Sequence, residues 1–218
     1  MIGLILPPGV AADEAFTDPP DVKLFPEEEA VIAKAADKRR REFTTTRACA
    51  RAALARLGLP PAPILPGLQG APQWPARVVG SMTHCAGYRA CAVAHDRDVR
   101  TIGLDAEPHD ALPDGVLGAV ASGDEQARLA ALTIAAPGVS WDRVLFSAKE
   151  SVYKAWFPLT RRWLGFEDAS VTIDPATGTF TARLLVDGPE VNGAALTGFE
   201  GRWLVDGGLI ITVIAVPA

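Results

Sequence analysis

The chain has 218 residues, of which 49% are hydrophobic and 22% charged, so it can bury a core as one large domain or two small ones. Its net charge of −5 argues against a general nucleic-acid binder, because counterion release from phosphates needs a surplus of Lys and Arg. The three cysteines, Cys49, Cys85 and Cys91, have no C-x-x-C spacing, which favours free thiols in a reducing compartment over disulfides or a metal site.

The amino-terminal third predicts a strand, two helices and a loop. The opening MIGLILPPGV is apolar, but it lacks basic residues and is interrupted by Pro7 and Pro8. It therefore predicts a strand rather than a signal peptide or a membrane span, and we expect a cytoplasmic protein. Acidic residues after a proline predict the start of helical structure, and two helices should occupy roughly residues 26–57. Residues 59–75 are so rich in Pro and Gly that they should form a loop.

The middle of the chain predicts more strands. Residues 88–94 and 99–107 are rich in β-forming side chains and are separated by HDRD, which indicates a hairpin. The pattern is weakest in residues 108–140, where a helix is expected at 123–132.

A helix from about residue 141 to 157 and a series of alternating strands complete the chain. The order of elements predicts an α+β fold in which two α+β halves, residues 1–104 and 105–218, meet near residue 105.

Two acids end one of the predicted strands. In IGLDAEP the two-residue period of a strand sends the carboxylates of Asp105 and Glu107 to the same face. Two carboxylates on one face repel each other unless a cation lies between them. A metal site is one interpretation, and a solvated strand end is the other.

The helix at 141–157 carries charges among large apolar side chains. Lys149, Glu150 and Lys154 share the helix with Phe146 and Tyr153, which places a third acid in a half-buried setting. Because Glu150 and Lys154 are four residues apart, the alternative is a simple surface ion pair.

The first helical region concentrates positive charge on an acidic protein. Eight of the 21 Lys and Arg residues lie between residues 34 and 56. By helical spacing Arg40, Arg47 and Arg51 share a stripe beside the apolar face, where guanidinium groups suit a phosphate ligand. A solvated helix face is the alternative.

A segment rich in hydroxyls, GSMTHCAG at residues 80–87, reads as a loop that leads into a strand. Its Ser81, Thr83 and His84 could form a phosphate cradle together with loop amides. A serine nucleophile is a weaker interpretation, because the G-x-S-x-G elbow is absent.

Taken in order, GSMTHCAG, IGLDAEP and FSAKESVYKAW resemble three signature blocks of the large, Sfp-like phosphopantetheinyl transferases, the group that includes the enterobactin-synthase branch. The likeness covers roughly residues 37–166 and is greatest to actinobacterial members. Such enzymes transfer the phosphopantetheine arm of coenzyme A to a serine of an acyl or peptidyl carrier protein and release adenosine 3′,5′-bisphosphate. The resemblance implies a monomer of two similar α+β halves, with coenzyme A in the cleft between them.

The resemblance also implies a metal site and a catalytic helix. Asp105, Glu107 and Glu150 would surround one Mg²⁺, which prefers hard oxygen ligands shared with phosphates and water. Glu150 would act as general base toward the carrier serine, directly or through a water. Lys149 and Lys154 would hold the diphosphate and stabilise the departing bisphosphate.

Further positions are implied for coenzyme A. Arg39 and Arg47 match cationic positions near its phosphates, with Arg40 as a close competitor. Thr83 and His84 match a pair near the ribose 3′-phosphate.

The turn from Gly70 to Pro72 resembles the loop against which adenine rests. Many relatives carry a lysine in or just before this loop, whereas this chain has no Lys or Arg between Arg56 and Arg77. We expect His84 and the arginine stripe to compensate. Trp163 would lie near the pantetheine arm or in the core, and residues 108–140 would face the carrier protein.

Two other functions use the same residues. A metal-dependent hydrolase would cleave a diphosphate or phosphodiester with water, and a coenzyme A or nucleotide-binding module would perform no chemistry. The sequence leaves open whether Mn²⁺ can replace Mg²⁺. It also leaves open whether the pathway makes siderophores, polyketides, peptides or cell-envelope lipids.

Overall fold

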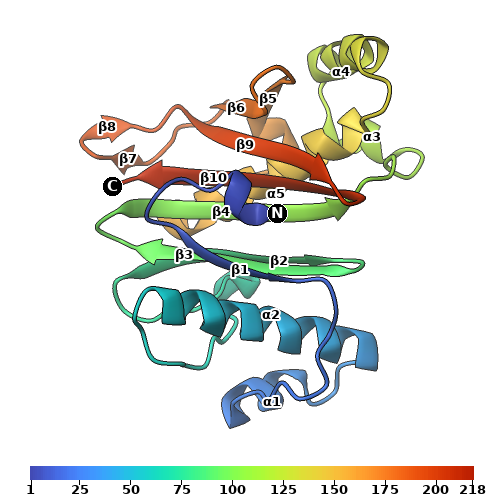
Figure 1. Cartoon of the computed structure of the whole chain (residues 1–218). Coiled ribbons are helices and arrows are strands. Elements are labelled where there is room, and N and C mark those ends of the chain that lie inside the picture. The colour runs from blue at the N-terminus through green and yellow to red at the C-terminus, as the bar shows by residue number, and fades with distance from the viewer.

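The computed structural model describes residues 1–218 and mixes helices with antiparallel strands (Figure 1). The helices are α1 Pro26–Ile32, α2 Asp37–Arg56, α3 Val116–Val120, α4 Gly123–Ala135 and α5 Trp141–Thr160. The strands are β1 Ala11–Ala15, β2 Val78–Cys85, β3 Tyr88–His95, β4 Val99–Pro108, β5 Ala169–Asp174, β6 Thr179–Leu184, β7 Glu190–Val191, β8 Ala194–Ala195, β9 Gly198–Asp206 and β10 Leu209–Pro217. Short 3₁₀ turns occur at Ile2–Leu4, Leu68–Gly70 and Phe166–Asp168. No helix has both the length and the apolar character needed to cross a bilayer.

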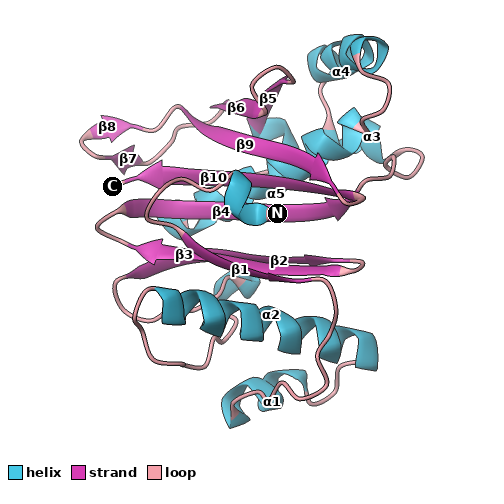
Figure 2. Ribbon diagram, in the orientation of Figure 1, coloured by secondary structure: helices cyan, strands magenta, loops and turns pink.

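Two sheets and two long helices define the architecture, which confirms the α+β class (Figure 2). The three-stranded sheet has the order β1-β3-β2, and the five-stranded sheet has the order β4-β10-β9-β6-β5. A 20-residue helix packs on each sheet, α2 against β1 and β3 and α5 against β4 and β10. The two halves therefore repeat one plan, a long helix on an antiparallel sheet. The small β7-β8 hairpin projects from the larger half.

The boundary between the halves is best placed in the turn at residues 96–98. Strand β3 belongs to the smaller sheet and β4 belongs entirely to the larger one. The expected boundary at 104/105 instead falls inside β4.

The predicted hairpin of residues 88–94 and 99–107 is wrong, although both segments are strands. Strand β3 pairs with β1 and β2, whereas β4 pairs with β10 from the carboxyl end of the chain. Nearly every residue of β3 and β4 is buried, which is typical of strands covered on both faces rather than of a hairpin with one wet face.

Two local assignments also differ from the sequence prediction. The opening segment forms a 3₁₀ turn, and the first strand starts only at Ala11. Ile2 and Ile5 nevertheless insert into the core between the sheets, which explains the apolar opening. The segment 80–87, expected to be a loop, lies mostly in strand β2, where residues 81 and 83 are buried. Its hydroxyls are therefore strand side chains that point inward.

Side-chain hydroxyls join the two sheets where β2 runs beside β4. Ser81 Oγ accepts a hydrogen bond from the backbone N–H of Leu104 at 3.0 Å, and Thr83 Oγ1 accepts one from the N–H of Ala106 at 3.1 Å. Backbone groups of β4 that would otherwise be buried without a partner are satisfied in this way. We call this junction the hydroxyl seam.

Helix α5 is fixed against β4 by its apolar face. Its buried side chains follow helical spacing and belong to the largest core cluster, namely Trp141, Val144, Leu145, Ala148, Val152, Ala155 and Trp156. Gly103 of β4 permits the close approach, since a Cβ atom there would collide with the backbone carbonyl of Ser151. The helix runs three residues beyond the predicted end, with Pro158 in its last turn, and it ends at Arg161, which adopts the left-handed conformation.

Candidate active site

A cavity of about 610 Å³ lies between the loop at residues 67–74 and helix α5. Gly70 and Pro72 line it on the loop side, and Glu150 and Lys154 line it on the helix side. The structure thus brings together predicted substrate-binding and catalytic residues that are about 80 positions apart in sequence. We call this space the cleft.

Asp105 is the most enclosed acid beside the cleft, with 5% of its surface exposed. Its Oδ1 accepts a hydrogen bond from Lys154 Nζ at 2.7 Å, and its Oδ2 accepts one from Ser147 Oγ at 2.8 Å. Thr83 Oγ1 lies 3.4 Å from Oδ1. Asp105 is therefore held from both halves of the molecule, by β2 and by α5.

Glu107 and Glu150 are half-buried, and both lie close enough to Asp105 for its charge to act on them. Burial raises the pKa of Glu150, and the negative charge of Asp105 raises it further, against the opposing effect of Lys154. Burial and Asp105 likewise raise the pKa of Glu107, although Arg143 Nη1 lies 2.9 Å from its Oε2 and opposes the shift. Both glutamates therefore sit in the field of Asp105, and Glu150 forms no ion pair of its own.

Lys149 does not face the cleft, which contradicts its predicted contact with the diphosphate. Its ammonium donates to Val120 O at 2.9 Å, Glu125 Oε2 at 2.9 Å and Phe166 O at 2.7 Å. These three acceptors use all of its protons. The physical reason is helix geometry: at about 100° per residue, Lys149 lies roughly 140° around α5 from Lys154, whereas Glu150 lies only about 40° from it.

Arg39 and His84 are brought together at the open edge of α2 and β2. Arg39 Nη1 lies 2.6 Å from His84 Nε2, and Glu42 lies 3.6 Å from the other ring nitrogen. Burial and then the charge of Arg39 lower the pKa of His84, so the ring stays neutral at physiological pH. With the ring neutral, the charges at this edge are those of the Arg39 guanidinium and of the Glu42 carboxylate, whose Oε2 lies 3.9 Å from Arg39 Nη1.

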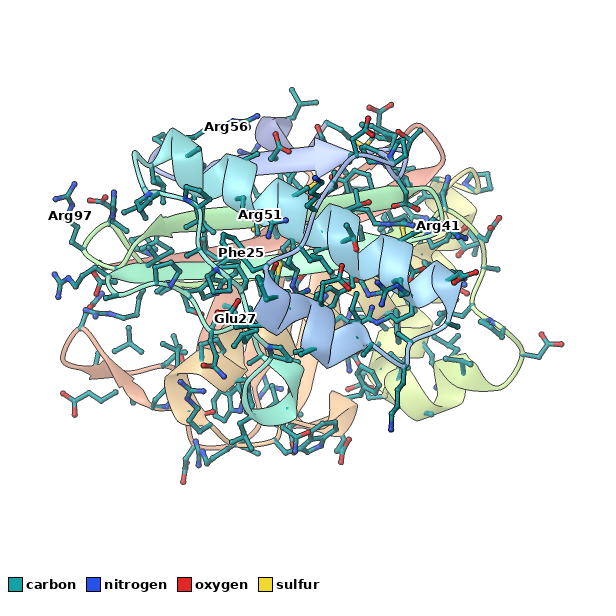
Figure 3. The ribbon with its side chains drawn as sticks, turned by 90° about the horizontal axis from the view of Figure 1, so that it is seen from below. Phe25, Glu27, Arg41, Arg51, Arg56 and Arg97 are labelled. Atoms are coloured by element: carbon teal, nitrogen blue, oxygen red, sulfur yellow. The ribbon has the colours of Figure 1, made fainter.

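The three arginines of the predicted stripe make different contacts: Arg40 and Arg51 pair with glutamates of α1, whereas Arg47 does not. Arg40 pairs with Glu29 at 2.8 Å and donates to Ile32 O, and Arg51 pairs with the buried Glu28 at 2.9 Å. Both arginines therefore fasten α1 to α2 and do not line the cleft. Figure 3 views the face of the molecule that carries α1 and α2. It shows Arg51 beside Phe25 near the middle of this face, with Arg41 and Arg56 toward opposite ends of α2.

Arg47 is buried and has no carboxylate partner. Its guanidinium stacks on Phe43 at 3.7 Å from the ring centre, and its Nε donates to Ile64 O at 3.2 Å. Burial lowers its pKa to about 10, so it keeps its charge at neutral pH. A desolvated cation without an ion pair is a favourable contact for an anionic ligand.

Comparison with known proteins places this geometry in a family. Residues 27–94 match the model of the 4′-phosphopantetheinyl transferase N-terminal domain, and residues 101–197 match that of the 4′-phosphopantetheinyl transferase superfamily. The chain is 57% identical over its full length to the 4′-phosphopantetheinyl transferase Svp of Streptomyces mobaraensis, covering 90% of that protein. The chain belongs to the 4′-phosphopantetheinyl transferase superfamily.

Two other relatives agree with this assignment. The chain is 50% identical to the 4′-phosphopantetheinyl transferase PptT of Mycobacterium tuberculosis, with 99% of the chain and 98% of that protein covered. It is 51% identical to the 4′-phosphopantetheinyl transferase Npt of Nocardia iowensis, with 99% of both chains covered. The family acts on coenzyme A and carrier proteins, and it generally depends on a divalent metal.

In this transferase the three predicted metal ligands do not form a ready-made cage. No group of three or more His, Cys, Asp and Glu side chains converges on one point. Lys154 engages Asp105 and Arg143 engages Glu107 instead. The donor chemistry nevertheless fits a divalent ion, because Asp105 raises the pKa of both glutamates and a cation would relieve that repulsion. Mg²⁺ is usually held by one or two carboxylates with phosphates and water, so a closed cage is not required.

Sequence reasoning missed two residues that contact the predicted metal ligands, Arg143 at Glu107 and Ser147 at Asp105. Together with Glu150 and Lys154 they fall at positions i, i+4, i+7 and i+11 of α5, which is one helical face. A helical stripe of polar residues on an otherwise apolar helix is the signal that could have revealed them. The buried partner of Lys149, Glu125, gave no such signal, because it lies on a different helix.

Proposed function

We propose that this transferase moves the 4′-phosphopantetheine arm of coenzyme A to the serine hydroxyl of an apo acyl or peptidyl carrier protein and releases adenosine 3′,5′-bisphosphate. The observation that carries the proposal is the cleft, in which Glu150 and Lys154 lie opposite the Gly70–Pro72 turn. One chain supplies both sides of this cleft, which supports a monomeric enzyme. Membership of the Sfp-like branch is part of the same proposal.

The nucleotide end of coenzyme A would lie along the smaller half. The Gly70–Pro72 turn offers backbone groups for adenine, and the guanidinium groups of Arg39 and Arg47 offer donors for the phosphates. His84 would hold Arg39 in place beside the 3′-phosphate, because its Nε2 accepts a hydrogen bond from Arg39 Nη1. Thr83 contributes indirectly in this arrangement, because its hydroxyl is engaged by Ala106 and Asp105. Arg40 and Lys149 are left out of the binding set, since both are bound to other parts of the protein.

The pantetheine arm would extend into a second cavity of about 230 Å³, which shares Glu150 and Tyr153 with the cleft. Trp163 lines it and is 71% exposed, with its ring 5.1 Å from that of Tyr153. An exposed tryptophan beside an apolar slot supports a role in contacting the arm rather than in core packing. The carrier serine would then approach Glu150 past Trp163, at the mouth of this second cavity.

The transfer step would use Glu150 as general base. The serine oxygen bonds to the phosphorus that carries the pantetheine arm, its proton passes to Glu150, and the bond to the 5′-phosphate of the bisphosphate breaks with its electron pair. The raised pKa of Glu150 brings its basicity closer to neutral pH, which improves proton transfer. Lys154 would stabilise charge on the leaving bisphosphate. Mg²⁺, held by Asp105, Glu107 and Glu150 with the diphosphate, would neutralise charge on the diphosphate when bound.

A mass measurement tests the proposal. The protein is incubated with coenzyme A, Mg²⁺ and a purified apo carrier domain, and the carrier is weighed. A gain of one phosphopantetheine unit, abolished by Glu150→Gln, is the expected result. Bisphosphate release without a carrier would instead indicate a hydrolase, and coenzyme A binding without any product would indicate a binding module.

A further inference from the structure

Arg143 is tied to Glu107 and to the turn that follows it by three hydrogen bonds, more than a solvated surface arginine would make. It lies in the first turn of α5, and its side chain is 15% exposed. Its Nη1 donates to Glu107 Oε2 at 2.9 Å, its Nε to Asp110 O at 3.1 Å and its Nη2 to Ala111 O at 2.8 Å. Each nitrogen of the guanidinium therefore has a different acceptor, an arrangement that lysine could not reproduce.

These contacts leave the two oxygens of Glu107 in different situations. Oε2 accepts a hydrogen bond from Arg143, whereas Oε1 accepts none from the chain. The backbone that follows Glu107 is fixed by the same guanidinium through residues 110 and 111. Arg143 thus holds both the carboxylate of Glu107 and the main chain that follows this residue.

The other two acids are held differently. Asp105 has both oxygens engaged, by Ser147 and Lys154, and Glu150 is the free base of the proposed reaction. Glu107 is the acid whose orientation depends on a single arginine. Removing that arginine would let the carboxylate turn toward solvent while Asp105 stays in place.

We propose that Arg143 is a positioning residue that acts through Glu107, keeping Oε1 of Glu107 available to a divalent cation bound next to Asp105, beside the cleft. The inference rests on the proposed function, since the cation is the one that function requires. Side chains that orient a metal ligand typically contribute tenfold or more to metal affinity.

The competing explanation is that Arg143 only fastens the turn at residues 110–111. Both roles predict some loss of activity when the arginine is replaced, so turnover alone does not separate them. Metal affinity in a double-mutant cycle does, because only an effect that passes through Glu107 disappears when Glu107 is also changed.

The experiment measures Mn²⁺ binding in the presence of coenzyme A and in the absence of a carrier, from the electron paramagnetic resonance signal of free Mn²⁺. We expect Arg143→Gln to raise the Mn²⁺ dissociation constant by about tenfold. Glu107→Gln should raise it similarly or more, and the double variant should match Glu107→Gln alone. Multiplying effects, or an unchanged dissociation constant in Arg143→Gln, would overturn the proposal.

Two further variants guard the result. Arg128→Gln is the matched control, because this α4 arginine donates to Ser170 and Val171 outside the cleft and should leave Mn²⁺ affinity unchanged. If Arg143→Gln unfolds, Arg143→Lys keeps the charge and can retain the bond to Glu107, and a dissociation constant within threefold of the native value is expected. If Arg143→Lys weakened Mn²⁺ binding tenfold, and did so equally in the presence of Glu107→Gln, Arg143 would act by fastening the turn at residues 110–111, and the proposal would be overturned. The titration needs no transfer, so failure of the proposed function would appear separately, in the mass assay.

Discussion

The two faces of helix α5 carry similar charges in opposite environments. On one face Glu150 and Lys154 line the cleft, and on the other Lys149 is buried against Glu125 with 4% of its surface exposed. Burial alone would raise the pKa of Glu125, but hydrogen bonds from Val171, Ser122 and Lys149 lower it. The pKa of Glu150 is raised. Adjacent residues of one sequence motif thus lie in opposite environments, Glu150 in the cleft and Lys149 in a buried ion pair.

The largest expected effect is on the cleft face. Glu150→Gln keeps the size of the side chain but removes the base, so the rate of transfer should fall by about 10²–10⁴-fold. Coenzyme A affinity and unfolding temperature should stay close to native values. Steady-state transfer and calorimetry measure these quantities, and a variant that retains a tenth of native activity would remove Glu150 from the role of base.

Replacing each lysine by methionine sharpens the comparison. Lys149→Met leaves Glu125 buried without its cation, and the free energy of unfolding should fall by about 3–5 kcal/mol. The double variant Lys149→Met/Glu125→Gln should recover part of this loss, because no buried charge remains. Chemical denaturation provides the measurement.

Lys154→Met should show the converse pattern. Transfer should fall by about 10²-fold, while the loss of unfolding free energy stays below about 2 kcal/mol, because Ser147 still binds Asp105. If both lysine variants lost stability equally and activity equally, the division between the two faces would be wrong.

The pH dependence of stability should have opposite signs on the two faces. The pKa of Glu125 in the folded protein lies below its ordinary 4.5, so its contribution is present above pH 4.5 and is lost as the pH falls through the folded value. The pKa of Glu150 lies above 4.5, so its ionisation destabilises the fold as the pH rises through that higher value. At pH 7 we expect Glu125→Gln to be less stable than the native protein and Glu150→Gln to be equally or more stable. Both differences should shrink below pH 4.5 in thermal denaturation, and parallel curves would contradict the assignment.

The smallest expected effect concerns the exposed edge of the smaller half. Arg39→Gln should raise KM for coenzyme A by about two- to fivefold, because a half-exposed cation is screened by solvent and salt. The effect should decrease at high ionic strength. Arg41→Gln is the matched control, since this neighbouring arginine is exposed and lies near the start of the same helix (Figure 3). Equal effects of the two variants would indicate general charge attraction rather than a contact by Arg39.

Patterns of neighbouring residues in the sequence were sufficient to predict part of the fold and the family. The helix at α5 and the acids at the end of β4 follow from local periodicity, and the resemblance of three motifs gave the family. The partner of β4 could not be predicted, because β10 lies about 100 residues away and pairs only once the core forms.

The predicted contact of Lys149 with the diphosphate was wrong for another reason. Its ammonium donates hydrogen bonds to Glu125, to Val120 at the end of α3 and to Phe166, and these contacts exist only in the folded chain. A motif read as one block therefore assigned both lysines to the same ligand. Helical angles alone would have separated them.

The hydroxyl seam has a practical consequence for anyone who wishes to take the enzyme apart. Because Ser81 and Thr83, rather than a backbone ladder, connect the two sheets, opening the chain in the turn at residues 96–98 would leave every strand pairing of both sheets intact. Co-expressed fragments 1–96 and 97–218 would meet through the apolar surface that surrounds Tyr88 and Leu104. Fused to two interacting proteins, such a split transferase would label a carrier only where those proteins meet.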